Sequence, residues 1–212
     1  YDIINGRYGT AVRVKFVYVS GDPFTSGQTS ATYRFIFPYK IDKRGIANVS
    51  ALDIRTPVPS QPYNFCSGIR HDIYIDGDLT IDYDASYCNA HFIMGQNSKI
   101  IIDPNKTVLF DNCTFRTCDP SVKWTGIVAG VGADIRVTGE SKFYSAITAI
   151  KCDNAAQLFV EGTNTSRTVL FNDCSTGISY RFTNPAFFNG ILNVNFATFE
   201  NTAIGIEMFN AG

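Results

Sequence analysis

The chain has 212 residues, of which 17% are charged and 14% aromatic, and its formal net charge is −1. This balance argues against a nucleic-acid-binding protein, which would carry a basic surface. No run of about 18 apolar residues occurs, so the sequence predicts no membrane-spanning helix. The first residue is Tyr1 rather than Met, which predicts a processed protein or a segment of a longer one.

The first third of the chain predicts a small β region. Residues 11–19 alternate apolar and polar side chains and predict a strand, and residues 31–41 predict a second strand that could pair with the first as a hairpin. Residues 42–64 are irregular and contain several prolines, which predicts an extended connector. We therefore expect an N-terminal hairpin and irregular region over 1–70, followed by a different fold over 71–212.

From residue 72 onward the sequence predicts many short strands and no helices. Segments of three to six residues alternate apolar and polar side chains, with Gly, Asn, Asp and Thr between them: 73–75, 79–81, 100–102, 108–110, 135–137, 158–160 and 191–196. No stretch keeps a 3.6-residue apolar period over three turns. The missing helical crossovers exclude a Rossmann-like or barrel α/β fold.

A phrase with a fixed spacing recurs in this second part. The phenylalanines Phe115, Phe143, Phe171 and Phe199 lie 28 residues apart, and so do Ile150, Ile178 and Ile206. A small residue precedes each isoleucine, and Gly126 with Ile127 fits the same phrase. A repeat of this length indicates a stacked architecture. We predict an all-β, right-handed parallel β-helix in which the Phe and Ile positions form interior columns. The alternative, an antiparallel sandwich or jelly roll, predicts no columns in register.

The phrase also carries a family resemblance. The run from Asn112-Cys-Thr-Phe115 through Cys118 to Trp124-Thr-Gly-Ile-Val128, after the strand Gly77-Asp-Leu-Thr-Ile81, resembles secreted right-handed parallel β-helix repeat proteins of Bacteroidota. The resemblance covers about residues 72–212. It implies export, commonly by the type IX route, as part of a large cell-surface or extracellular protein.

The six cysteines show neither a CxxC pair nor a nearby histidine, so a zinc site is poorly supported. The Phe register places Cys118 and Cys174 in one column, two coils apart, which is too far for a disulfide. We expect most cysteines to be small buried hydrophobic residues. Cys66 and Cys88 are the one pair that could bridge, which would tie the connector to the first coil.

Parallel β-helices include polysaccharide lyases and hydrolases, so clustered acids beside a base would indicate catalysis. The candidate acids are Asp82, Asp84, Asp111, Asp119, Asp153 and Asp173, and the candidate bases are Arg116, Arg136 and Lys151. The acids fall mainly at strand ends, where Asp is a turn former. The single tryptophan, Trp124, could stack on a sugar, but packing at a coil corner is the favoured interpretation.

These observations favour an exported, non-enzymatic β-helix module that acts as a rigid scaffold or adhesion element, without cofactor, metal or catalytic residues. Its partners would be surface glycans or other subunits of a surface assembly. One alternative is a polysaccharide lyase or glycoside hydrolase, and another is a self-assembling extracellular fibre subunit. No capping segment follows the last phrase, so we expect further coils of a longer chain, or another chain, to cover that end.

Overall fold

The computed structural model describes residues 12–16, 31–35, 39–54, 66, 70–153, 156–182 and 190–210. Strands β1 (Val12–Phe16) and β2 (Ala31–Phe35) pair antiparallel, which confirms the central part of the predicted hairpin. Residues 11, 17–19 and 36–38 of those two predicted strands, the loop between them and the prolines of the predicted connector lie outside the described residues. The end of the second predicted strand, residues 39–41, belongs to a separate strand, Tyr39–Asp42.

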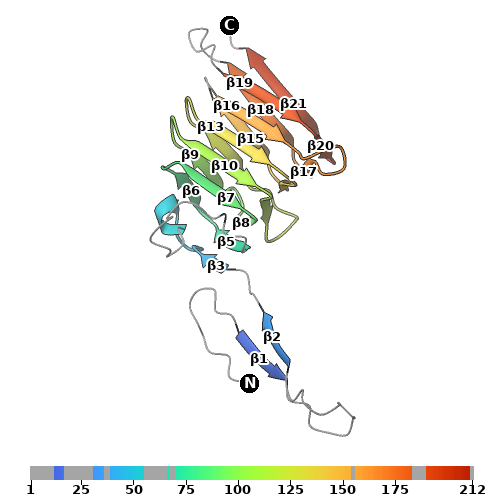
Figure 1. Ribbon diagram of the computed structural model, residues 1–212. Helices are drawn as coiled ribbons and strands as arrows, with labels where there is room; N and C mark the ends of the chain where they lie inside the picture. Colours follow the sequence, from blue (N-terminus) through green and yellow to red (C-terminus); the bar gives the residue numbers. More distant parts are fainter. Residues whose placement is uncertain are drawn as a thin grey trace.

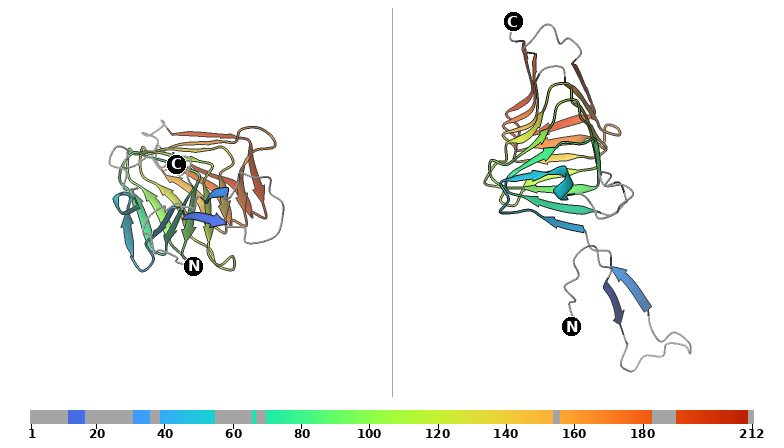
Figure 2. Two further views of the ribbon diagram at one scale, coloured as in Figure 1. Left: turned by 60° about the horizontal axis from the view of Figure 1, so that its bottom comes forward. Right: turned by 90° about the vertical axis from the view of Figure 1, so that its left-hand side faces the viewer.

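The rest of the described chain is a parallel β-helix with three walls (Figures 1 and 2). The Phe sheet, named for its interior column, contains β3 (Tyr39–Asp42), β5 (His71–Ile75), β8 (Ala90–Met94), β11 (Thr114–Thr117), β14 (Lys142–Tyr144), β17 (Val169–Asn172) and β20 (Ala197–Glu200). The Ile sheet contains β4 (Asn48–Ser50), β6 (Asp78–Ile81), β9 (Lys99–Ile102), β12 (Gly126–Ala129), β15 (Thr148–Asp153), β18 (Thr176–Phe182) and β21 (Ile204–Asn210). The third sheet contains β7 (Ala85–Cys88), β10 (Thr107–Asp111), β13 (Asp134–Thr138), β16 (Gln157–Glu161) and β19 (Ile191–Asn195).

From β5 to β19 each coil contributes one strand to each wall, and successive coils pair in parallel. Residues Phe115, Phe143, Phe171 and Phe199 stand in one register, and their successive ring centroids lie 4.6, 4.9 and 4.9 Å apart. The column extends one coil further to Phe92, whose ring lies 4.9 Å from that of Phe115. This spacing is the strand separation of about 4.8 Å, so the rings follow the backbone pairing.

The second column runs along the Ile sheet in the same way. Ile127, Ile150, Ile178 and Ile206 pair in sequence, and Ile100 precedes them. The first three and Ile100 are fully buried. Fully burying one such side chain contributes about 1.5–3 kcal/mol relative to leaving it exposed, so the columns account for much of the stability of the stack.

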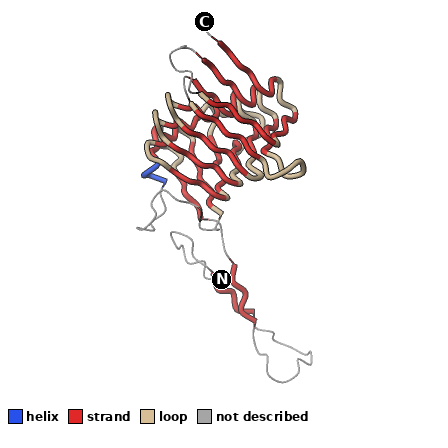
Figure 3. Tube along the Cα trace, turned by 45° about the horizontal axis from the view of Figure 1, so that its top comes forward, coloured by secondary structure: helices blue, strands red, loops and turns tan. Residues whose placement is uncertain are grey.

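The corners between walls are tight, and several contain residues with positive φ. Asn89 and Asn112 have φ angles of 55° and 52° at successive corners between the third sheet and the Phe sheet. Ser145 and Asp173 have 52° and 55° at successive corners between the Phe and Ile sheets. Asn and Asp tolerate this conformation better than most residues, which explains their abundance between the predicted strands. Figure 3 shows the strands as the walls and the loops at their corners.

The parallel stack begins before the boundary that the sequence predicts near residue 70. Strand β3 pairs with β5 through Ile41 and Ile73, and β4 pairs with β6 through Val49 and Leu79. The short 3-10 helix η1 (Ala51–Ile54) follows β4 inside the segment that the sequence describes as an irregular connector. The Phe and Ile phrase is absent from these first strands, so the repeat alone could not locate them.

At the other end of the stack, β19, β20 and β21 are each the last strand of their sheet. Ile206 is 42% exposed although its partner Ile178 is fully buried, and Phe199 is only partly buried although Phe171 is fully buried. The interior columns therefore reach the surface at this end. The expected covering of this end by further coils or another chain stays a prediction.

A disulfide joins Cys66 to Cys88, the pair that the sequence singled out. Cys88 ends β7, so the bond fastens the segment before β5 to the first complete coil. Cross-linking residues 22 positions apart restricts the unfolded chain. We expect replacement of both cysteines by serine to lower the free energy of unfolding by about 2–4 kcal/mol, measured by urea denaturation.

The matched control for the disulfide is Cys118→Ser, because Cys118 is exposed and unbridged and its replacement should leave the unfolding free energy unchanged. In addition, alkylation of the unfolded, unreduced wild-type chain should modify the four free cysteines, Cys113, Cys118, Cys152 and Cys174. Modification of all six cysteines would contradict the assignment.

Candidate functional site

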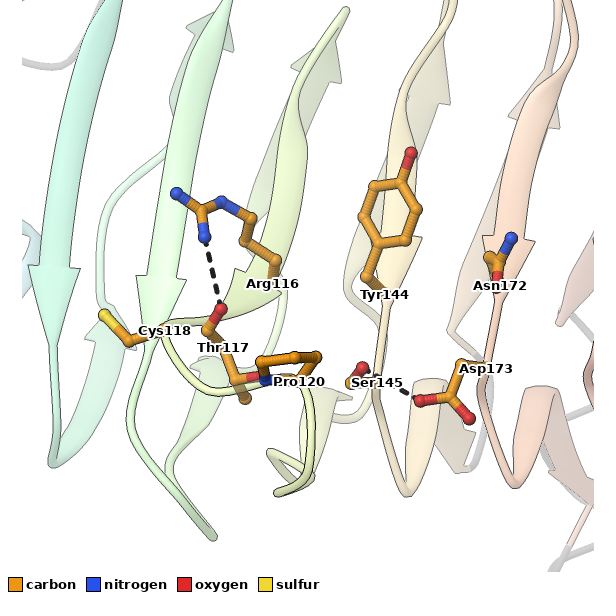
Figure 4. A pocket seen from close by; sticks show the side chains of 8 residues that line it. All are labelled: Arg116, Thr117, Cys118, Pro120, Tyr144, Ser145, Asn172 and Asp173. Atoms are coloured by element: carbon orange, nitrogen blue, oxygen red, sulfur yellow. Dashed lines mark hydrogen bonds between the residues drawn. The ribbon is translucent and has the colours of Figure 1, made fainter.

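The candidate site is a groove of about 410 Å³ on the outer face of the Phe sheet (Figure 4). Its floor consists of Arg116, Tyr144 and Asn172, which lie on the successive strands β11, β14 and β17. Each of the three directly follows a phenylalanine of the interior column. Because side chains alternate along a strand, the inward Phe column forces these neighbours outward. The repeat of phenylalanines in the interior therefore also fixes the positions of these three outward-facing residues, which form a row on the surface.

One side of the groove is a loop, residues 118–123, which leaves the stack after β11. Thr117, Cys118 and Pro120 line the groove on this side. The Thr117 hydroxyl donates to the Asp119 carbonyl oxygen at 2.8 Å, and the Asp119 carboxylate accepts from the Ser121 amide at 2.8 Å. These short-range hydrogen bonds give the loop a defined shape beside the row of floor residues.

The loop is anchored at its far end by Trp124. The indole is fully buried, lies 6.0 Å from the Phe115 ring between centroids, and donates from Nε1 to the Tyr144 carbonyl oxygen at 3.0 Å. The preferred interpretation of Trp124, packing at a coil corner rather than stacking on a sugar, is confirmed. Its hydrogen bond also fixes the backbone of the floor residue Tyr144.

The opposite corner of the groove contains one carboxylate, that of Asp173. It accepts a hydrogen bond from the Ser145 hydroxyl at 2.9 Å, and the Lys123 Nζ lies 3.3 Å from its other oxygen. Lys123 also donates to the Asp173 carbonyl oxygen. Lys123 ends the loop, so this contact ties the loop to a corner fifty positions away in the sequence. Through these contacts the Asp173 carboxylate holds the loop against the corner of the groove.

Arg116 is exposed, and Nη1 donates to the Thr117 carbonyl oxygen at 3.3 Å. Within the described part of the chain it pairs with no carboxylate. On the neighbouring strand β8, burial lowers the pKa of His91, and the positive charges of Arg70 and Arg116 act in the same direction. His91 is therefore mainly neutral at pH 7, and Arg116 supplies the local positive charge at the groove.

The candidate acids lie at strand ends or in corners, as their turn-forming role predicts. The Asp84 carboxylate accepts from the Thr107 amide at 2.8 Å, and the Asp111 carboxylate accepts from the Thr138 hydroxyl at 2.8 Å. The others occupy the end of β15 (Asp153), the residue after β6 (Asp82), the loop (Asp119) and the groove corner (Asp173). Among the described residues, no three His, Cys, Asp or Glu side chains are arranged to hold a metal ion.

The candidate bases are dispersed. Arg116 lies in the groove, but Arg136 is on the third sheet, 3.2 Å from the Asp134 carboxylate, and Lys151 is on the Ile sheet, 3.3 Å from that of Asp153. The structure therefore brings together Arg116 and Asp173 from the candidate set and separates Arg136 and Lys151 from them.

One cysteine assignment is wrong. Trp124, not Cys118, precedes Ala146 and Cys174 in their column, because the loop displaces Cys118 from the regular register. Cys118 is exposed, whereas Cys113, Cys152 and Cys174 are buried as expected. Burial raises the pKa of the Cys113 and Cys152 thiols to about 12, so both remain protonated and unreactive at neutral pH.

Comparisons of the chain with protein-family models, with curated proteins and with solved structures found no match. The fold assignment therefore rests on the strand pairing, and the resemblance to secreted proteins of Bacteroidota stays a prediction. In the described part of the chain, no helix is both long and apolar enough to cross a membrane.

Proposed function

We propose that this chain is an exported, non-enzymatic β-helix module that serves as a rigid scaffold or adhesion element of a cell-surface or extracellular protein. The observation that carries the proposal is the unbroken Phe column. Phe92 to Phe199 stack in five successive coils, with neighbouring ring centroids 4.6 to 4.9 Å apart. Because the coils between the two ends are packed on both neighbours, they resist independent movement, which suits a spacer that presents a surface at a fixed position.

The disulfide supports the exported location. Disulfides persist in oxidising compartments and are rare in the reducing cytosol. The Cys66–Cys88 bond fastens the segment before β5 to the end of β7 in the first complete coil. Export by the type IX route, as the family resemblance implies, is one way to such a compartment and is part of the proposal.

The location can be tested on intact cells of the source organism with an antibody against the chain and with brief protease treatment. We expect the antibody to label intact cells or the medium, and the recovered chain to contain a Cys66–Cys88 peptide under non-reducing conditions. A chain found inside the cell with both thiols reduced would overturn the proposal.

The second candidate function is a polysaccharide lyase or hydrolase. The observation in its favour is the groove, where Arg116 and Asp173 line one hollow. Such an enzyme needs further acids converging beside a base. The self-assembling fibre is the third candidate, favoured by the exposed Ile206 and by the position of β19, β20 and β21, each the last described strand of its sheet.

A further inference from the structure

The groove on the Phe sheet combines a cationic group with an aromatic ring. Most described basic side chains on the outer faces are paired with carboxylates within 4.0 Å, as Lys99 is with Asp78 and Arg136 with Asp134. Arg116 makes no such pair in this part of the chain, and neither does Lys142, which lies on the same face of β14 as Tyr144. The carboxylate at the corner of the groove, that of Asp173, is already paired with Lys123, so the unpaired Arg116 of the floor favours an anion.

The shape and lining of the groove define the anion further. Tyr144 is half-buried, and its ring stands between Arg116 and Asn172 in Figure 4. An aromatic ring beside a polar row suits a ligand with an apolar face and many hydroxyl groups, which is the surface of a sugar ring. The volume of about 410 Å³ lies within the range of roughly 300–1,000 Å³ that small-ligand sites have.

The hydrogen-bonding groups of the row match the same ligand. A guanidinium forms two parallel hydrogen bonds to a carboxylate, which a lysine cannot do. Arg116 donates from Nη1 to the Thr117 carbonyl oxygen, and its other N–H groups make no hydrogen bond with a described residue, so they are available to a ligand. The Asn172 amide, one of whose donors binds the Glu200 carboxylate at 3.1 Å, has further capacity for hydroxyl groups.

We propose that this groove binds an acidic saccharide of the uronic acid type, with the carboxylate on Arg116, the sugar ring against Tyr144 and hydroxyl groups on Asn172. The inference deepens the proposed adhesion function and rests on it. The partner is thus a uronate-containing glycan laid across β11, β14 and β17, which the chain holds without cleaving.

The test is isothermal titration of the full chain with a galacturonic acid oligosaccharide and with the matched neutral galactose oligosaccharide. We expect the acidic probe to bind roughly 10- to 100-fold more tightly than the neutral one, because a hydrogen-bonded ion pair is lost with the carboxylate. Arg116→Gln should abolish that preference, and Tyr144→Ala should weaken binding of the acidic probe about tenfold. The control Arg136→Gln, on the third sheet, should bind as the wild type does.

Several outcomes would overturn the inference: no binding of the acidic probe, equal binding of the neutral probe, or an Arg116→Gln variant that binds as the wild type. Circular dichroism of each variant separates lost binding from lost folding, and Arg116→Lys, which keeps the charge but loses the paired geometry, should retain only part of the affinity. If the chain is on the cell surface but does not bind the acidic probe, glycan binding by the groove is refuted, while the scaffold function still stands. Release of cleaved sugar refutes the non-enzymatic function and leaves the groove as a sugar site.

Discussion

Replacing Phe171 by alanine should lower the free energy of unfolding by about 3–5 kcal/mol. Its ring is fully buried and stacks on Phe143 and Phe199, with centroids 4.9 Å away on both sides. The neighbouring rings belong to paired strands, so they cannot move together to fill the hole, and the cavity cost adds to the lost burial. Urea denaturation of the full chain, followed by circular dichroism, measures the change.

The matched control is Phe159→Ala. Phe159 is half-buried on the outer face of the third sheet, with the Arg136 guanidinium carbon 4.9 Å from its ring centroid. Its removal forfeits partial burial and a cation–π contact, for which we expect a loss of about 1 kcal/mol. If Phe171→Ala cost no more than Phe159→Ala, the Phe column would not be the core of the fold.

Replacing Gly126 by alanine should destabilise the chain by about 4 kcal/mol or more, which is at the upper end for a single substitution. Gly126 begins β12 with φ of +119°, and a Cβ atom there would lie 1.6 Å from the Thr148 carbonyl oxygen. That oxygen is backbone on the paired strand β15, so relief requires the two strands to separate. Thermal unfolding of the variant measures the loss of stability. If the loss exceeds the stability of the wild type, we expect a yield of folded protein far below that of the wild type.

Gly205→Ala is the control at the equivalent position, before Ile206. A Cβ atom at Gly205 would meet the Phe199 ring at 3.3 Å, a contact that a small shift of the side chain relieves. We expect less than about 1 kcal/mol of destabilisation. Equal and small effects at both glycines would show that β12 and β15 do not approach as described.

The interior columns could be predicted because their residues recur at one spacing in the sequence. The first residue of the Phe column could not be predicted, because it does not follow that spacing. Phe115, Phe143 and Phe171 are 28 residues apart, whereas Phe92 precedes Phe115 by only 23. The basic coil is shorter than the repeat suggests, and extra residues enter at different corners. In one coil they form the loop of residues 118–123. A search at a fixed spacing therefore finds the coils with insertions and misses those without.

The groove could not be predicted, although two of its residues, Arg116 and Asp173, were among the candidates. Its wall is the insertion, and its closure depends on Lys123 reaching Asp173 across fifty positions. The available signal was the distance between column residues: Ile127 follows Phe115 by 12 residues, but Ile150 follows Phe143 by 7. Extra residues at one corner of a coil indicate a loop that protrudes from the stack. The outward-facing residue that follows each Phe of the column then lies beside this loop, and the two together form a groove.

The proposed non-enzymatic function of this β-helix can be tested with a product assay on polysaccharides. The full chain would be incubated with acidic and neutral polysaccharides, with and without added Ca²⁺, while unsaturated products and new reducing ends are measured. We expect no product above the rate without protein for any substrate. Turnover that a single substitution such as Asp173→Asn abolishes, in a variant that still folds, would show that the protein is an enzyme and that the groove is the site of a lyase or hydrolase.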